Sequence, residues 1–141
     1  MTYGSVLDYY PADAVHYDYE TTLKGVMQKE DPTNDEFIVE KKLKELYKAK
    51  DYGQYGENGE MVVCFLTTND ITGGNSGSPV INGDGQLIGL AFDGNWEAMS
   101  GDIMFEPDMQ RTICVDARYV LFIIDKYAGA SNIIKELTLV K

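Results

Sequence analysis

A glycine-rich loop that runs directly into two apolar segments is the feature that most limits how this chain can fold. Residues 73–79 are Gly-Gly-Asn-Ser-Gly-Ser-Pro, and the apolar segments 80–81 and 87–92 follow, with Asn-Gly-Asp-Gly between them. Asn, Asp and Gly accept the positive φ angles of a tight hairpin turn, so the two segments are predicted to pair as antiparallel strands. Pro79 lacks an N–H but is tolerated at the first position of a strand.

The loop also has the composition that a nucleophilic serine requires. Such a serine needs an exposed hydroxyl on a tight turn, beside backbone N–H groups that bind the oxyanion formed during acyl transfer. Ser76 is the candidate nucleophile, and the N–H groups of Gly74 and Ser76 are the candidate oxyanion-hole donors. A glycine at position 74 leaves the backbone free to turn its amide inward. The alternative is an ordinary surface loop, because Gly and Ser are common between strands.

The pattern Gly-x-Ser-x-Gly also marks the nucleophile elbow of α/β-hydrolases, in which the serine joins a strand to a helix. Here Ser76 is followed by Pro79 and a hairpin. The order of elements therefore favours a trypsin-like β-barrel over the hydrolase elbow.

Several stretches of the chain resemble the bacterial dipeptidyl-peptidase VII and XI family of chymotrypsin-like serine exopeptidases. The similar stretches are residues 74–83, 87–103 and 111–122, together with residues 21–27 and 30–34 upstream. The resemblance covers nearly the whole chain and is to the C-terminal part of the family. It implies two β-barrels with an added helical domain, and release of dipeptides from the free N-terminus of oligopeptides.

The length of the chain fits only part of such a protein. At 141 residues and 44% apolar composition, the chain can bury one core. We therefore expect a mainly β chain with flanking helices (α+β), forming the C-terminal barrel and terminal helix of a trypsin-like double β-barrel. Residues 1–59 are expected to be a helical and loop lead-in segment, and residues 60–141 to be the barrel portion with the nucleophile loop.

The general base that a serine nucleophile needs has no convincing candidate in the sequence. His16 is the single histidine and lies in a Tyr- and Asp-rich stretch, residues 12–19, so a surface or half-buried imidazole is the favoured interpretation. The resemblance assigns the catalytic His and Asp to an N-terminal barrel. That barrel and the helical domain of the same chain are then the expected partners, and the isolated chain is expected to be inactive. The alternative is a non-catalytic barrel-derived module for binding or assembly.

A second candidate site lies at the end of the predicted hairpin. By the resemblance, Asp93 pairs with the free α-ammonium group of the substrate, and Gly94 stands where members that cleave after Asp or Glu carry arginine. The resemblance is thus closer to the type VII enzymes and implies a hydrophobic penultimate residue. From the residues alone, an ordinary Asp-Gly turn is favoured. Trp96 is expected to pack at the pocket wall. Asp93, Asn95 and Glu97 lack the pattern of a calcium loop, so neither metal nor cofactor is expected.

Charge and hydropathy disfavour nucleic acids and membranes as partners. The chain has 12 Lys and Arg against 23 Asp and Glu, a formal net charge of −11, which disfavours nucleic-acid binding. The longest apolar run, residues 120–124, is far shorter than the roughly 20 residues that span a bilayer. The first residues do not form a secretory signal. The resemblance implies a periplasmic or cell-envelope protein whose signal lies upstream, and an oligopeptide substrate.

Two further points stay open at this stage. Cys64 and Cys114 each lie in an apolar, strand-like run, so a disulfide and two separate thiols are both compatible with the sequence. Exposed strand edges and apolar patches leave self-association, for example as a homodimer, as another open alternative.

Periodicity and breaker residues predict the remaining elements. Residues 3–10 are expected to be extended, with the run broken at Pro11. Helices are expected at 21–29, 35–49, 117–127 and 131–137, and strands at 61–67, 79–81, 86–92 and 112–115. In the helix at 117–127 the residues expected to face inward are Val120, Ile123, Ile124 and Tyr127.

Overall fold

The computed structural model describes residues 1–100 and 106–140, so the end of the similar stretch 87–103 lies outside the described residues. The chain divides into two compact units, each built from two separate stretches of sequence. Unit 1 comprises Met1–Glu20 and Cys64–Ala117, and unit 2 comprises Thr21–Val63 and Arg118–Lys141. The expected domain division at residue 60 concerns a larger fold and stays a prediction.

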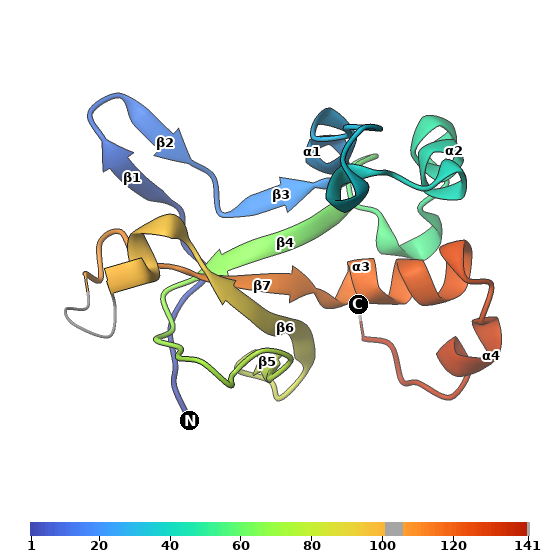
Figure 1. Cartoon of the computed structure of the whole chain (residues 1–141). Helices are drawn as coiled ribbons and strands as arrows, with labels where there is room; N and C mark the ends of the chain where they lie inside the picture. The colour runs from blue at the N-terminus through green and yellow to red at the C-terminus, as the bar shows by residue number, and fades with distance from the viewer. Residues whose placement is uncertain (101–105, 141) are drawn as a thin grey trace. The chain divides into compact units, whose positions relative to one another are not determined.

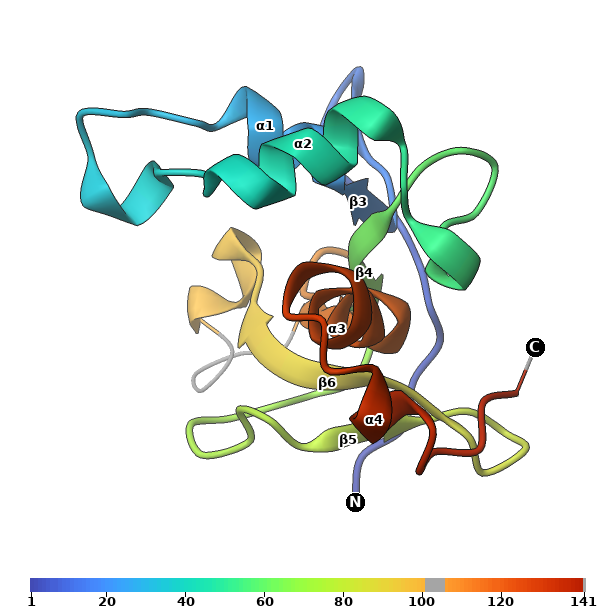
Figure 2. The same ribbon diagram turned by 90° about the vertical axis from the view of Figure 1, so that its right-hand side faces the viewer.

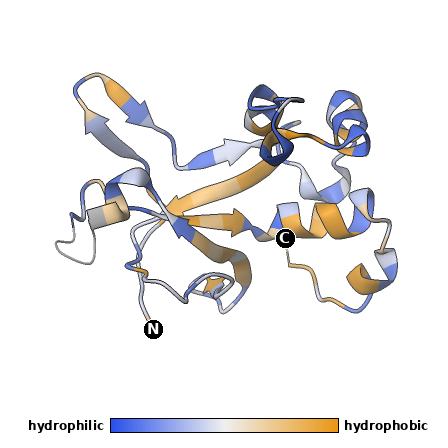
Figure 3. Ribbon diagram, viewed as in Figure 1, coloured by the Kyte–Doolittle hydropathy of each residue, from blue (hydrophilic) through white to orange (hydrophobic). Residues whose placement is uncertain are grey.

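A sheet whose strands β4, β5, β6 and β7 pair antiparallel lies mainly in unit 1, whereas its strand β3 lies mainly in unit 2. The sheet has the order β3-β4-β7-β6-β5, so that β7 pairs with both β4 and β6, and β5 pairs with β6 (Figure 1). Its strands are β3 (Glu20–Thr22), β4 (Val62–Thr67), β5 (Pro79–Ile81), β6 (Leu87–Gly94) and β7 (Thr112–Asp116). β4 and β7 are largely apolar (Figure 3). The strands predicted at 61–67, 79–81, 86–92 and 112–115 are confirmed, and β6 extends two residues further than expected.

Close packing within the sheet depends on a glycine in β6. A Cβ atom at Gly89 would lie 2.6 Å from the carbonyl oxygen of Val115 and 2.7 Å from the ring of Phe65. Phe65 and Cys114 are buried neighbours across β4 and β7. The ring of Phe65 therefore occupies the space that a larger residue at position 89 would need.

The pairing of β4 with β7 settles the question of the two cysteines. Phe65 pairs with Cys114 and Cys64 pairs with Val115. Because successive side chains of a strand point to opposite faces of a sheet, the two sulfur atoms lie on opposite faces. Cys64 and Cys114 are accordingly not joined by a disulfide.

A separate two-stranded hairpin, β1 (Tyr9–Ala12) and β2 (Val15–Tyr17), also belongs to unit 1. The expected break at Pro11 is wrong, since Pro11 lies inside β1. Both strands of a two-stranded sheet are edge strands, where a residue without an N–H is tolerated. The turn passes through Ala14 at φ 60°.

Unit 2 is a small helical unit with its own core. Its helices are α1 (Leu23–Gln28), α2 (Lys41–Ala49), α3 (Ala117–Phe122) and α4 (Ser131–Ile134), and a π-helical turn, Ile123–Tyr127, continues α3. α1 and α2 lie side by side in both ribbon views (Figures 1 and 2). The buried core consists of Leu23, Tyr52, Tyr55, Met61 and Phe122. The mainly β fold class with flanking helices is confirmed.

Two helix predictions require correction. The helix expected at 35–49 is split into a 3-10 turn, Asp35–Phe37, and α2, because residues 38–40 are not helical and Val39 among them is buried. At 117–127 the fully buried residue is Phe122, which was not predicted, while Ile123 of the predicted set is half-buried and packs against the core.

In the part of the chain that the structure describes, every helix is too short or too polar to cross a membrane.

Candidate active site

The loop that carries Ser76 is exposed and is fastened to β6 at its far end. The Ser76 hydroxyl donates a hydrogen bond to the carbonyl oxygen of Phe92 at 3.3 Å. The Gly77 N–H donates to the carbonyl oxygen of Ala91 at 2.7 Å, and the Ala91 N–H donates to that of Ser78 at 2.8 Å. Ser76 therefore contacts β6 at Phe92, where the pairing of β6 with β7 shifts register.

The backbone amides of the loop fall into two groups. The Asn75 N–H donates to the carbonyl oxygen of Thr72 at 3.1 Å, and the Gly77 N–H is bonded to β6 as described. Among the described residues, the N–H groups of Gly74 and Ser76 have no acceptor. Gly74 has φ 98° and Gly77 has φ 84°, conformations that favour glycine. The loop thus presents two backbone N–H donors, separated by one residue, that no described residue uses, beside the exposed Ser76 hydroxyl.

The side chain of Asn75 orders the same loop from inside. Asn75 Oδ1 accepts a hydrogen bond from the Thr72 N–H at 2.9 Å. The backbone carbonyl oxygen of Asn75 accepts a second one from the Ser78 N–H at 2.9 Å. A neutral amide therefore holds the turn through local bonds.

Asp93 and Gly94 lie at the end of β6, immediately after this contact. The pairing of β6 with β7 shifts register between Ala91 and Asp93, and Asp93 and Gly94 then pair with Ile113 and Thr112. The Asp93 side chain is exposed, and its Oδ1 accepts the Gly94 N–H at 2.8 Å. The carboxylate thus faces solvent, one residue beyond the carbonyl group that the serine contacts.

The prediction that Trp96 packs against a pocket wall is wrong for this structure. Its side chain is 84% exposed. Asn95, the residue before it, is buried instead. The chain turns into a 3-10 segment at Trp96–Ser100, which carries the indole outward.

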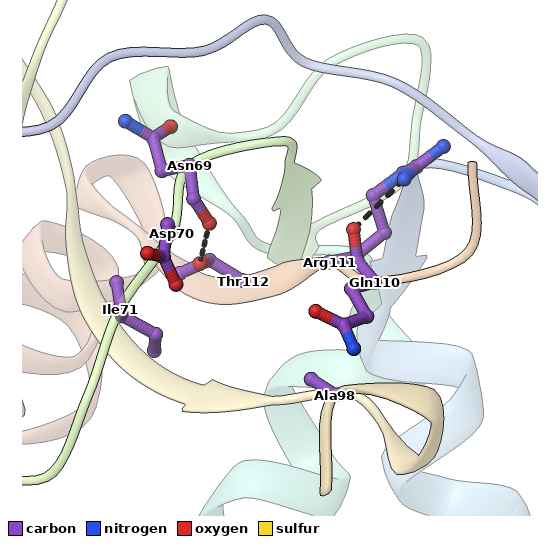
Figure 4. Close-up of a pocket in the computed structure, with 7 residues that line it drawn as sticks. All are labelled: Asn69, Asp70, Ile71, Ala98, Gln110, Arg111 and Thr112. Atoms are coloured by element: carbon purple, nitrogen blue, oxygen red, sulfur yellow. Dashed lines mark hydrogen bonds between the residues drawn. The ribbon is translucent and has the colours of Figure 1, made fainter. Parts of the chain in front are cut away.

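A small cavity of about 20 Å³ lies beside Gly94 in unit 1 and was not anticipated from the sequence. It is lined by Asn69, Asp70, Ile71, Ala98, Gln110, Arg111 and Thr112 (Figure 4). A Cβ atom at Gly94 would lie 3.0 Å from that of Ala98, which lines the cavity. The Thr112 hydroxyl donates to the carbonyl oxygen of Asn69 at 2.6 Å and ties two of its walls together. The lining mixes polar and apolar surface, and the space holds about one water molecule.

His16 lies on the β1–β2 hairpin and is engaged there. Its Nε2 is 2.7 Å from the carboxylate of Asp8, and its ring stacks on Tyr10 with 4.5 Å between centroids. No contact joins it to Ser76 in the described ranges. The same ranges contain no cluster of three or more His, Cys, Asp or Glu side chains that could hold a metal ion.

Comparison with known proteins gives consistent matches over the whole chain. The family model described as Peptidase S46 matches residues 1–139. A dipeptidyl-peptidase 7 from Phocaeicola vulgatus is 68% identical over 142 residues, covering 100% of this chain and 20% of that protein. An Asp/Glu-specific dipeptidyl-peptidase from Porphyromonas gingivalis is 54% identical over 141 residues, covering 99% of this chain and 20% of that protein.

Solved structures match in fold as well as in sequence. The crystal structure of Porphyromonas endodontalis DPP11 in complex with the dipeptide Arg-Glu aligns with a TM-score of 0.93 and 54% identity. The alignment covers 96% of this chain and 20% of that one. The chain therefore spans about one fifth of the length of the relatives it matches.

Proposed function

This chain belongs to the peptidase S46 family, and on that premise we propose that it is the nucleophile-bearing C-terminal portion of a serine exopeptidase that releases dipeptides from oligopeptides. The observation that carries the proposal is the loop at Ser76. An exposed hydroxyl lies beside two amide donors that nothing else in the described chain uses. This arrangement suits nucleophilic attack on a carbonyl group with the oxyanion held by the Gly74 and Ser76 amides.

The general base would come from the rest of a longer polypeptide. His16 is held by Asp8 on the hairpin, and relatives are about five times longer than this chain. The His and Asp of a catalytic triad would then be supplied by an N-terminal, trypsin-like barrel, with a helical domain beside it. On its own, the 141-residue chain would hydrolyse peptides too slowly to matter, because a serine without a base is a weak nucleophile.

The Asp93 carboxylate would bind the free α-ammonium group of the substrate. It is exposed at the end of β6, and Phe92 links its position to that of Ser76. A fixed anion at a set spacing from the nucleophile would explain how an enzyme measures two residues from an N-terminus. A charge-assisted hydrogen bond of this kind is among the stronger polar contacts.

Gly94 would set the preference for the penultimate residue. It brings no cation to meet an acidic side chain, so we propose a preference for hydrophobic residues. A pocket of about 580 Å³ is lined by Asn75 and Ser78 of the serine loop and by Ala91 of β6, whereas Ala98, beside Gly94, lines the small cavity. The small cavity holds about one water molecule, so it would have to widen to take a substrate side chain. Related proteins bear both names, dipeptidyl-peptidase 7 and Asp/Glu-specific dipeptidyl-peptidase, and measured preferences would separate the two types.

The cellular setting follows from the same proposal. Related dipeptidyl-peptidases are bacterial, and peptide degradation in the periplasm or cell envelope would suit an exopeptidase that acts on imported oligopeptides. Self-association as a homodimer remains a prediction.

One observation favours a second candidate, a non-catalytic binding or assembly module. The single histidine of the chain is bonded to Asp8, and no base contacts Ser76 within the described residues. In that case the serine loop would be a remnant of the barrel and would carry no activity in the longer protein either.

A dipeptide-release assay tests the proposal. The longer polypeptide that contains this chain is incubated with oligopeptides that have free or acetylated N-termini, and products are identified by mass spectrometry. We expect dipeptides only from the free peptides, and loss of release in the Ser76→Ala variant. Equal release by Ser76→Ala would refute the assignment of the nucleophile and favour the second candidate.

A further inference from the structure

A connected cluster of polar side chains lies just beyond Asp93 and Gly94 in unit 1. We call its members the Asn95 cluster: Tyr9, Asn95, Glu97 and Arg111. Tyr9 is 8% exposed, Asn95 is 6% exposed and Arg111 is 3% exposed, so three of the four are buried. Buried polar groups are stable where their hydrogen bonds are made, and this cluster makes them within itself and with nearby backbone carbonyl groups.

Asn95 is the hub of the cluster. Its Oδ1 accepts the Arg111 N–H at 2.8 Å, and its Nδ2 donates to the carbonyl oxygen of Met109 at 2.8 Å and to Glu97 Oε2 at 2.9 Å. Its own backbone N–H donates to the carbonyl oxygen of Arg111 at 2.9 Å. Both amide hydrogens are thus used, and the residue that follows Gly94 is fixed from the side chain as well as from the backbone.

Arg111 anchors the other side. Its guanidinium donates to the carbonyl oxygens of Asp8, Pro107, Asp108 and Gln110 at distances from 2.8 to 3.2 Å. It also lies over the ring of Tyr9, 5.7 Å from the centroid. The cation therefore joins the start of β1 to the segment that precedes β7.

Tyr9 and Glu97 complete the cluster. The Tyr9 hydroxyl donates to Glu97 Oε2 at 3.0 Å, the same oxygen that accepts from Asn95. Burial and the neighbouring Glu97 carboxylate raise the pKa of Tyr9, so its hydroxyl stays a donor at neutral pH. Each member thus holds another in place, and none of the bonds reaches the exposed Asp93 carboxylate.

We propose that Asn95 is a positioning residue that sets where Asp93 and Gly94 stand relative to Ser76, and so sets the dipeptide spacing of the reaction. The inference rests on the proposed function of the serine and of Asp93. β6 is tied to the serine loop at Ala91 and Phe92 and to the cluster at Asn95. Asp93 and Gly94 lie between these two attachments and pair with Ile113 and Thr112 of β7. The attachment at Asn95 fixes the end of the strand just beyond this pairing, and so limits how far the carboxylate can move.

The first test is a double-mutant cycle in the longer polypeptide. Asn95→Ala is expected to lower kcat/KM for dipeptide release by about 100-fold, because a misplacement of about 1 Å has that cost. In an Asp93→Asn background the same substitution should lower it less than about 3-fold, because it acts through Asp93. Asn132→Ala, an exposed asparagine in α4, is the matched control.

Labelling of Ser76 by a fluorophosphonate separates positioning from loss of structure. The reagent has no α-ammonium group, so its rate depends on the serine and its base and not on Asp93. We expect the Asn95→Ala variant to be labelled at nearly the rate of the unaltered protein. An equal fall in labelling and in dipeptide release, or an equal loss in the Asp93→Asn background, would overturn the inference.

A second variant, Asn95→Asp, keeps the shape of the side chain and replaces its NH2 donor by a charged acceptor. Asn95→Asp retains the acceptor for the Arg111 N–H but places a carboxylate against Glu97 Oε2, where Asn95 Nδ2 now lies at 2.9 Å. Two carboxylates at that distance share a proton when the pH falls. The activity of this variant, taken as a ratio to the unaltered protein at each pH, should therefore rise as the pH is lowered.

Rescue completes the design. Glu97→Gln added to Asn95→Asp supplies a donor to the new acceptor, so it should remove the pH dependence and restore part of the activity. The bond to the carbonyl oxygen of Met109 stays lost in both variants. A pH-independent ratio for Asn95→Asp alone, or no rescue by N95D/E97Q, would contradict the inference. Absence of Ser76-dependent release from the unaltered protein would instead refute the proposed function, and this inference with it.

Discussion

The hydroxyl of Ser76 and the carbonyl oxygen of Phe92 lie 3.3 Å apart, and Asp93 is the next residue in the chain. A single strand, β6, thus carries both the contact to the proposed nucleophile and the proposed ligand for the substrate N-terminus. The hydroxyl must leave this carbonyl to donate its proton to a base. The contact therefore describes a resting arrangement of the loop, from which attack would begin.

The backbone amide of Gly74 is expected to contribute more to catalysis than that of Gly73. An added Cβ atom would meet open space at both Gly73 and Gly74, but only Gly74 has a positive φ, 98°. Gly74→Ala should strain the backbone and turn its N–H away from the oxyanion, lowering kcat by about 100-fold. Gly73→Ala is the matched control, with activity close to that of the unaltered protein. Equal kcat values for the two variants would count against the oxyanion role.

Gly94→Arg should change the penultimate preference. A guanidinium at this position would meet Asp or Glu side chains and should raise kcat/KM for acidic substrates relative to hydrophobic ones by about 10-fold or more. Gly94→Ala introduces the same Cβ, 3.0 Å from that of Ala98, without the charge. The comparison uses oligopeptide substrates with a free N-terminus that differ only in the penultimate residue. A preference that moves equally in both variants would show that crowding, not charge, governs the site.

Gly89→Ala should destabilise unit 1. The added methyl group would collide with the carbonyl of Val115 and the ring of Phe65, at an expected cost of about 1–3 kcal/mol in the free energy of unfolding. Gly83→Ala, in the hairpin turn that precedes β6, meets nothing within 4 Å and serves as the control. Urea denaturation monitored by circular dichroism measures both. The idea fails if the two variants unfold at the same urea concentration.

Stability should fall in alkaline solution. Burial raises the pKa of Cys114 above its ordinary value of 9.0, and those of Tyr9, Tyr52 and Tyr55 above 10.0. As the pH rises, the unfolded chain therefore loses these protons before the folded chain does. The contribution of these groups to the free energy of unfolding is complete below about pH 9 and is lost as the pH rises through the raised pKa values.

The alkaline prediction is checked by denaturation at a series of pH values. Tyr52→Phe is the informative variant, because the buried Tyr52 hydroxyl has no hydrogen-bond partner among the described residues. The substitution should keep the packing and reduce the alkaline loss of stability. A free energy of unfolding that stays constant beyond about pH 10 would contradict this account.

Much of the β architecture could be predicted because its signals are local. In the hairpin between β5 and β6, Asn82 Oδ1 accepts the N–H groups of Asp84 and Gln86 at 3.0 and 2.9 Å, and Gly85 takes φ 80°. Every one of these bonds spans four residues or fewer. The turn type therefore follows from neighbouring residues alone.

The parts that the sequence did not reveal depend on contacts between distant segments. Tyr9 meets Glu97 across 88 positions, and Asn95 meets Arg111 across 16. The cavity beside Gly94 likewise needs separate segments to be brought together. The apolar character of Trp96 predicts that it packs at a pocket wall, but in the structure Trp96 is exposed and its neighbour Asn95 is buried. No local pattern carries that information.

Covalent labelling of Ser76 tests the central claim most directly. The longer polypeptide and the isolated 141-residue chain are treated with the same fluorophosphonate, and the modified peptide is mapped by mass spectrometry. The account predicts rapid modification at Ser76 in the longer polypeptide, none in its Ser76→Ala variant, and very slow modification of the isolated chain. Modification of the isolated chain at the full rate, or none at Ser76 in the longer polypeptide, would contradict it.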